Sequence, residues 1–168
     1  TAGIYTITVG DANGCTVSST ATVNEPIALT WTSAVATDVL CFGGSDGSVT
    51  VAATGGTGAI NYNLQAGNQN NASGIFANLI AGAYTLTATD ANGCSITTLL
   101  QVNQPAALAW TVSAATDISC NGGNDGSISV TATGGTGTIN YTLQPNNITN
   151  VSGQFTNLIA GVYTVSAV

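Results

Sequence analysis

Four cysteines and a small set of aspartates are the side chains whose types and spacing could support chemistry in this chain. Cys15 returns as Cys94 and Cys41 returns as Cys120, each after 79 residues (94 minus 15, 120 minus 41). Two cysteines in each repeated unit predict structural disulfides rather than reactive thiols. Zinc is a poor alternative, because the chain has no histidine and no Cys-x-x-Cys pair.

The aspartates could contribute ligands to calcium at the joints between units. Calcium takes six to eight oxygen ligands, several of them carboxylates. In the competing interpretation, which the sequence favours, Asp46-Gly47 and Asp90-Ala91-Asn92-Gly93 are turns in which Asp bonds its own backbone. No cofactor is required by the sequence, and calcium is the ion for which ligands can be named. The candidate ligands are Asp38, Asp46, Asp90, Asp117 and Asp125.

The composition excludes most enzymatic mechanisms. The chain has seven acidic residues, no lysine, arginine or histidine, and a net charge of −7. Histidine bases, Schiff-base lysines and arginine clamps are therefore impossible, and the Ser, Thr and Cys side chains have no base to activate them. Phosphate neutralisation needs Lys or Arg, so we expect no nucleic-acid partner. We predict that the chain is not an enzyme.

The offset of 79 residues holds along the whole chain. Cys41-Phe42-Gly43-Gly44-Ser45-Asp46-Gly47-Ser48 returns as Cys120-Asn121-Gly122-Gly123-Asn124-Asp125-Gly126-Ser127 without insertion or deletion. A strict period of this kind is typical of an array in which one folded unit is copied. We predict the last strands (F and G) of one repeat in residues 1–26, a complete repeat in 27–105, and a further repeat in 106–168 that stops within strand F.

Each repeat alternates apolar and polar residues with period two, between Gly- and Asn-rich turns. This pattern is typical of an all-β sandwich. Hydrophobic residues make up 44% of the chain, enough for a core, and no run of about 18 apolar residues suggests membrane insertion in this segment. Residues 65–73 read as a loop or a weak edge strand. The predicted strands of the complete repeat are A (28–37), B (47–54), C (59–65), E (74–79), F (83–90) and G (94–102).

Aromatic residues refine this fold class to tandem immunoglobulin-like sandwich domains in a head-to-tail array. Leu79-Ile80-Ala81-Gly82-Ala83-Tyr84 has the form of a tyrosine corner, in which a Tyr near the start of strand F bonds backbone a few residues upstream. Tyr5 and Tyr163 occupy the same position in the neighbouring copies. Trp31 and Trp110 alternate with threonines on a strand, which predicts core or junction residues.

The partners of the cysteines depend on the sandwich topology. A bond within one repeat would join Cys41 to Cys94, and bonds across a junction would join Cys15 to Cys41 and Cys94 to Cys120. In an antiparallel sandwich the two positions lie at opposite ends of strands that span roughly 26 Å, beyond the limit of about 7 Å between disulfide Cα atoms. Head-to-tail stacking would instead bring Cys41 to the F–G turn of the following repeat. We favour this bond between adjacent repeats, and the bond within one repeat stays open.

The linked motifs resemble the SprB-type repeat of very large surface adhesins from gliding Bacteroidota. The motifs are Cys-x-Gly-Gly-x-Asp-Gly-Ser, Gly-Gly-Thr-Gly, Asn-Leu-x-Ala-Gly-x-Tyr-Thr, Asp-Ala-Asn-Gly-Cys and a closing Asn-x-Pro. The resemblance implies export through the type IX system and a place outside the cell, on its surface, in adhesion or gliding. The chain departs from the family where Ala59-Ile60-Asn61-Tyr62 replaces the usual Pro-Tyr, and where Leu64 replaces the usual Trp.

Two functions follow as hypotheses. In the first, the repeats form a stiff extracellular stalk or filament that carries an adhesive tip, and their partners are adjacent repeats or identical chains. In the second, the repeats themselves bind polysaccharide or neighbouring filaments. Specificity would then lie in residues 65–73 and 144–152, the stretch that varies most between copies.

Overall fold

The structure is a computed structural model that describes residues 1–168, and it consists of β-strands joined by turns. The strands form several sheets in a sandwich-like arrangement, which confirms the predicted all-β fold class. No helix is present that is long and apolar enough to cross a membrane.

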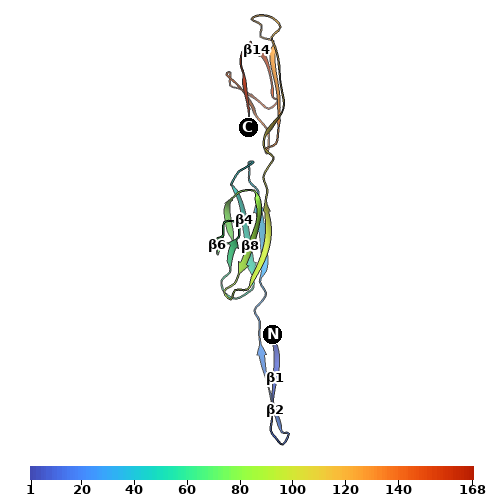
Figure 1. The fold of residues 1–168 in the computed structure, drawn as a ribbon, viewed down its shortest axis with the longest axis vertical. Helices are drawn as coiled ribbons and strands as arrows, with labels where there is room; N and C mark the ends of the chain where they lie inside the picture. Colours follow the sequence, from blue (N-terminus) through green and yellow to red (C-terminus); the bar gives the residue numbers. More distant parts are fainter. The chain divides into compact units, whose positions relative to one another are not determined.

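The first two strands form an antiparallel hairpin. Strand β1 (Gly3–Gly10) pairs with β2 (Thr16–Val23) in an unbroken register from Gly3↔Val23 to Gly10↔Thr16 (Figure 1, blue). All residues of both strands are exposed. We call residues 1–26 the N-terminal hairpin.

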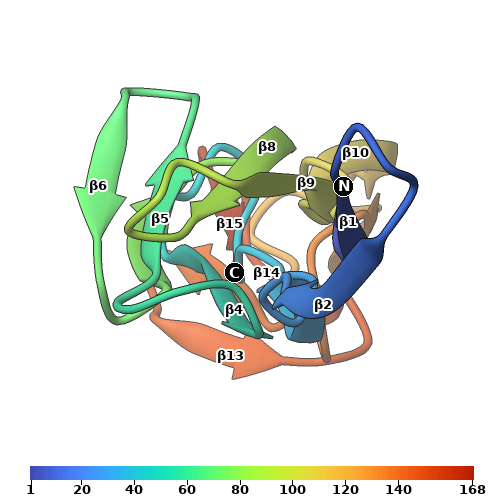
Figure 2. The same cartoon turned by 90° about the horizontal axis from the view of Figure 1, so that it is seen from below.

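Residues 27–105, the central segment, contain two sheets. The three-stranded sheet has the order β3-β4-β7, and the four-stranded sheet has the order β6-β5-β8-β9, with β6 at its edge (Figure 2). The strands are β3 (Thr30–Thr37), β4 (Gly47–Thr54), β5 (Asn61–Leu64), β6 (Gln69–Asn71), β7 (Ile75–Leu79), β8 (Gly82–Thr89) and β9 (Ser95–Val102).

Residues 106–168, the C-terminal segment, repeat this order strand by strand. One sheet has the order β10-β11-β14 and the other β13-β12-β15, so no strand of the segment corresponds to β9. The strands are β10 (Ala109–Thr116), β11 (Gly126–Thr133), β12 (Tyr141–Gln144), β13 (Ile148–Asn150), β14 (Gln154–Leu158) and β15 (Thr164–Ala167).

The strand boundaries agree with the sequence pattern to within two residues at each observed end of the predicted strands. Predicted strand B coincides with β4, while predicted strand C is shortened to β5. The Asn-rich stretch 65–73 contains β6, a three-residue strand that pairs only with β5. The period-two alternation places Val49 and Val51 in the interior, with 0% and 2% of their surfaces exposed. Alternation alone therefore located the buried face.

Two glycines set the spacing of the sheets because no side chain fits at their positions. A Cβ on Gly74 would lie 2.1 Å from the Val51 carbonyl oxygen, and the Val51 amide donates to the Gly74 carbonyl at 2.8 Å. Gly153 has the same relation to Val130 one repeat later. Both glycines have positive φ, at 69° and 67°, which other residues adopt only at a cost.

Contacts between residues divide the chain into two compact units. The F–G turn around Asp90 belongs to the first unit, and the corner around Cys41 belongs to the second. The first unit comprises Thr1–Val35, Thr50–Ile75 and Tyr84–Leu100, and the second comprises Ala36–Val49, Phe76–Ala83 and Gln101–Val168.

Candidate functional site

The Asp90 turn in the first unit is organised around one buried carboxylate. Asp90 is 6% exposed, and its Oδ1 accepts hydrogen bonds from the Asn92 amide at 3.0 Å and the Cys94 amide at 2.8 Å. Its Oδ2 accepts from the Thr57 amide at 2.8 Å, which ties the turn to the Gly-rich loop after β4. The Thr57 bond is the main reason that the pKa of Asp90 lies below its ordinary value of 3.8; burial opposes this shift, and the Cys94 and Asn92 bonds reinforce it.

The Gly-rich loop can approach Asp90 only because it lacks side chains there. A Cβ on Gly56 would lie 2.7 Å from Asp90 Oδ2, and a Cβ on Gly55 would lie 2.1 Å from the Ala28 carbonyl oxygen. Both glycines have positive φ, at 65° and 92°. The loop is therefore a structural brace for the turn and has none of the lysine chemistry of a phosphate-binding loop.

The Cys41 corner in the second unit is held by backbone and amide contacts. The Gly44 amide donates to the Cys41 carbonyl at 2.9 Å, and the Gly43 amide donates to Gln104 Oε1 at 2.9 Å. Asp46 accepts from the Leu40 amide at 3.2 Å. The corner is thus closed on itself and is also fixed to the residues that follow β9.

The ends of β3 and β9 are joined beside this corner. The Val39 amide donates to the Asn103 carbonyl at 3.0 Å, and the Asn103 amide donates to Asp38 Oδ1 at 2.7 Å. The Asn103 side chain donates to the same carboxylate at 3.1 Å. Asp38 and Asn103 therefore clamp the first strand of the central segment to its last strand, and we call these contacts the Asp38–Asn103 clamp.

The candidate calcium ligands are used as acceptors in these turns. The structure brings together no group of three or more Asp, Glu, Cys or His side chains that could hold a metal. In the C-terminal segment Asp125 accepts from the Ser119 amide at 3.0 Å, and the Ser119 side chain is the main cause of a lowered pKa of Asp125. Asp117 lines a hollow beside β10 and β11. The hydrogen bonds of the turn interpretation are present, and calcium at a joint between repeats stays a prediction.

All four cysteines are free and exposed in the structure. Cys94 and Cys15 each close a turn by donating their amide to an aspartate, Asp90 or Asp11, at 2.8 Å. Neither the bond within one repeat nor the bonds across a junction are formed. The favoured bond of Cys41 involves a position beyond residue 168, so pairing between adjacent repeats stays a prediction.

The tyrosines of the corner motif bond the backbone four residues upstream. The Tyr163 hydroxyl donates to the Ile159 carbonyl at 3.0 Å, and the Tyr5 hydroxyl donates to the Thr1 carbonyl at 2.6 Å. Tyr84 lies at the equivalent position and is 6% exposed. These bonds fix the chain as it enters strands β1 and β15, which is the role of a tyrosine corner.

The tryptophans pack on tyrosines of the neighbouring strands. The rings of Trp31 and Tyr62 are 6.2 Å apart, and those of Trp110 and Tyr141 are 6.1 Å apart. Trp31 Nε1 is buried without a hydrogen-bond partner, whereas Trp110 is 48% exposed. Packing of this kind belongs to the margin of a core and does not form a sugar-stacking platform.

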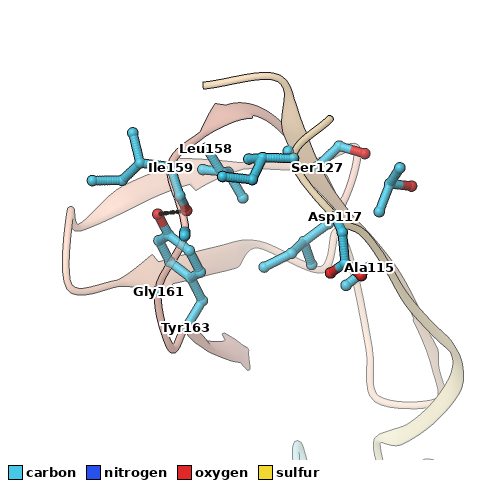
Figure 3. Close-up of a pocket in the computed structure, with 12 residues that line it drawn as sticks. Ala115, Asp117, Ser127, Leu158, Ile159, Gly161 and Tyr163 are labelled. Carbon is cyan, nitrogen blue, oxygen red and sulfur yellow. Dashed lines mark hydrogen bonds between the residues drawn. The ribbon is translucent and has the colours of Figure 1, made fainter. Parts of the chain in front are cut away.

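A hollow of about 390 Å³ in the C-terminal segment is the main concave feature of the second unit. Figure 3 shows Leu158, Asp117 and Tyr163 around it, with the Tyr163 hydroxyl directed to Ile159 rather than into the hollow. Its lining is mostly Ala, Ile, Leu and Gly, and Asp117 is its only charged group. The hollow contains no nucleophile paired with a base, so it offers no catalytic machinery.

Three structural residues were missed in the sequence. Gln104 and Asn103 organise the Cys41 corner, and the Tyr62 hydroxyl accepts a hydrogen bond from the Ala53 amide at 2.9 Å. Tyr141 accepts from Ala132 in the same way at 3.0 Å. The available signal was the exact return of Tyr and Ala after 79 residues, which apolar patterning alone does not interpret.

Comparison with known families gives one match. The family model described as the SprB repeat matches residues 33–69 and 112–152. These ranges cover β3 to the start of β6 in the central segment, and β10 to β13 in the C-terminal segment. Among curated proteins, none matches the chain. The two matches repeat with the same offset as the turns described above, and the chain therefore belongs to the SprB repeat family, with one copy of the repeat in each segment.

Proposed function

We propose that this chain is a structural segment of a long extracellular stalk or filament of a bacterial surface adhesin, in which the repeats act as stiff spacers. The SprB repeat is a structural repeat of surface proteins. The observation that carries the proposal is the Asp38–Asn103 clamp, because it joins the two strands through which tension must pass.

The clamp is placed to resist pulling along the chain. Tension enters the central segment before β3 and leaves it after β9. It would therefore shear the three hydrogen bonds that link Asp38 and Val39 to Asn103, instead of opening them one at a time. Bonds to a carboxylate are stronger than bonds between neutral groups. This arrangement suits a spacer that transmits force.

The recurrence of the turns supports the same role. Asp11 accepts from the Asn13 and Cys15 amides just as Asp90 accepts from the Asn92 and Cys94 amides. The Gly123 amide bonds Cys120 as the Gly44 amide bonds Cys41. The polar groups of these turns are thus occupied within each repeat, and what is copied along the chain is a scaffold.

Single-molecule pulling on the full chain tests the spacer role. We expect Asp38→Ala to lower the force at which the central segment unfolds, because the clamp loses its carboxylate. Asp117→Ala is the matched control: it removes the equivalent aspartate of the C-terminal segment, for which the structure records no hydrogen bond to a closing strand. Equal unfolding forces for Asp38→Ala and the unchanged chain would contradict the proposal.

Export by the type IX system and a role in gliding are finer proposals that rest on the family assignment. Antibody labelling of intact cells of the source bacterium would detect a surface protein. Loss of the label in a strain without a functional type IX system would support the export route, and an unchanged label would contradict it.

A binding role has one specific observation in its favour: the outer edge of the four-stranded sheet differs between copies. Asn63 Nδ2 donates to Asn68 Oδ1 at 3.0 Å and to Asn70 Oδ1 at 2.8 Å, which leaves an amide-rich edge on β5 and β6. The equivalent edge carries a pair of hydroxyls, Thr142 and Thr149, 3.1 Å apart. A polysaccharide array probed with the chain and with Asn70→Ala tests this role. Binding that Asn70→Ala removes would favour the binding module over the spacer.

A further inference from the structure

The N-terminal hairpin exposes an apolar face that the repeat normally buries. Tyr5, Ile7 and Val9 alternate along β1 and share a face with the cross-strand partners of β2, because Tyr5 pairs with Ala21 and Val9 pairs with Val17. Ile7 and Val9 are 58% and 63% exposed.

The equivalent residues of the central segment are inside. One repeat later, Ile7 becomes Leu86 and Val9 becomes Ala88, and both are 0% exposed. Val23 becomes Val102, which is also 0% exposed, whereas Val23 itself is 50% exposed. The hairpin therefore carries the sequence of a buried pair of strands without the sheet that buries them.

The C-terminal segment has the complementary deficiency. Every residue of β10 is exposed, although its counterpart β3 has a half-buried residue at each of three positions: Trp31, Ala34 and Ala36. Two hollows, of about 390 and 480 Å³, lie along β10 and β11 and share Ala115 and Ile128 in their linings. This open groove is apolar and has no covering strand.

In the central segment β9 fills the equivalent space. A Cβ placed on Gly47 would lie 2.7 Å from Val102 Cγ1, so β9 packs directly on the start of β4. Gly126 is the counterpart of Gly47, and its nearest neighbours are the Leu158 carbonyl and Ile118, with no residue in the place of Val102. The β9 sequence has a close counterpart in this chain, which is β2.

We propose that the hairpin of one copy of this chain docks into the open groove of a second copy. In the docked state β1 takes the place of β15 at the edge of β12, and β2 covers β10 as β9 completes the central segment. The exchange is feasible because β15 is only four residues long and pairs with β12 alone. The segment Tyr163-Thr164-Val165-Ser166-Ala167 is replaced by Tyr5-Thr6-Ile7-Thr8-Val9, which has the same pattern and larger apolar groups.

A second copy is the favoured occupant because the fit is specified position by position. The hairpin has the β8–β9 register that a SprB repeat accommodates, and the groove has the β3 and β4 surface that this register covers. The two surfaces lie on different parts of the chain, so the contact is head-to-tail and continues from copy to copy. Strand donation of this kind is a recurrent mode of assembly through β-sheets.

Charge makes a distinctive contribution to this association. Each copy carries a net charge of −7 with no basic group to offset it, so two copies repel each other. Salt screens this repulsion and leaves the apolar contact intact. The proposed assembly therefore strengthens as ionic strength rises, whereas an interface built on opposite charges would weaken.

Sedimentation of the full chain in a reducing buffer tests the proposal, since the reductant excludes disulfide-linked species. We expect the mass to rise from that of the 16.5 kDa single chain to at least twice that value over about a hundredfold range of concentration. Ile7→Asp removes the apolar anchor and should keep the chain monomeric. Thr6→Asp adds the same charge on the opposite face of β1 and should leave assembly intact.

Complementation between two blocked variants gives the decisive result. Ile7→Asp has a blocked hairpin and an open groove, and Ala115→Glu has a free hairpin and a blocked groove. Both substituted residues are exposed in the single chain, so the variants should fold. Each variant alone should be monomeric, and an equal mixture should form dimers that grow no further. A mixture that stays monomeric overturns the proposal, as does equal loss of assembly in Thr6→Asp and Ile7→Asp.

Failure of this test is separable from failure of the spacer role. The groove and the hairpin are not part of the Asp38–Asn103 clamp, so the pulling experiment reads a different set of contacts. A chain that stays monomeric but loses unfolding force in Asp38→Ala would retain the spacer function and exclude strand exchange.

Discussion

The central and C-terminal segments contain the same repeat in two states of completion. With β9 in place, Leu29 is 9% exposed and Leu86 is 0% exposed; in the C-terminal segment Leu108 is 44% exposed and Val165 is only partly buried. The sequences at these positions are closely similar, so the difference in burial follows from the one strand that the C-terminal segment lacks.

Other positions are indifferent to that strand. Leu64 and Leu143 are both 0% exposed, and Phe76 and Phe155 are 1% and 3% exposed. The repeat therefore has an inner core that six strands suffice to bury, and an outer part that depends on β9. The comparison explains why the C-terminal segment keeps its fold and still presents an apolar groove.

The largest expected effect separates these two parts of the core. Leu86→Ala should lower the free energy of unfolding by about 2–5 kcal/mol, because it leaves a cavity in a fully buried site. Val165→Ala at the matched position should cost on the order of 1 kcal/mol, since the side chain is already partly in water. Denaturant unfolding of both variants measures the difference. Equal losses would show that β9 is not what closes the outer core.

Glycine substitutions at one turn give the next contrast. Gly56→Ala should destabilise the chain by more than the roughly 1–2 kcal/mol of left-handed strain, because its Cβ would also meet Asp90 Oδ2 at 2.7 Å. Gly135→Ala has a similar φ of 67°, but its Cβ would meet only Leu108, at 3.4 Å. Thermal melting of the two variants should rank Gly56→Ala well below Gly135→Ala. The reverse order would mean that the Asp90 brace does not stabilise the turn.

Period-two alternation and turn chemistry were sufficient to predict most of the fold. The alternation placed Val49 and Val51 in the core, and the Asp-Ala-Asn-Gly sequence located the turn after β8. The Leu-Ile-Ala-Gly-x-Tyr pattern located the tyrosine corner. These signals are local, and each acts within a few residues, so they can be read without knowing the tertiary arrangement.

What sequence reasoning could not supply depends on distant partners. Asn103 and Gln104 looked like linker residues before Pro105, yet they bond Asp38 and Gly43, more than 60 positions earlier. Asp90 looked like a turn aspartate, and the tie from its second oxygen to Thr57 could not be read from its own turn. Sequence spacing does not specify contacts between residues that only the folded sheet brings together.

Removal of a tyrosine hydroxyl should affect both segments alike. Tyr62 and Tyr141 each accept a hydrogen bond from a backbone amide of the neighbouring strand, at 2.9 and 3.0 Å, and neither bond involves β9. Tyr62→Phe and Tyr141→Phe should each cost about 1–3 kcal/mol, the penalty for a buried amide left without an acceptor. Hydrogen exchange at Ala53 and Ala132 would report the loss locally. A clear difference between the two variants would place the Tyr hydroxyls among the features that depend on β9.

The smallest effect is a pH dependence that separates the Asp90 turn from its exposed counterpart in the N-terminal hairpin. The pKa of Asp90 lies below its ordinary value of 3.8 in the folded chain, chiefly because of the Thr57 amide. A carboxylate whose pKa is lowered by folding contributes stability at higher pH, and this contribution is lost as the pH falls through the folded pKa.

Unfolding free energy should therefore decrease as the pH falls below 3.8. Asp90→Asn should flatten that decrease, since an amide side chain does not titrate. Asp11→Asn is the control, because Asp11 closes the same turn with two amides but has no bond like that from Thr57. Parallel pH profiles for Asp90→Asn and the unchanged chain would show that the carboxylate gains nothing from the Gly-rich loop, and the two turns would then be equivalent despite their different burial.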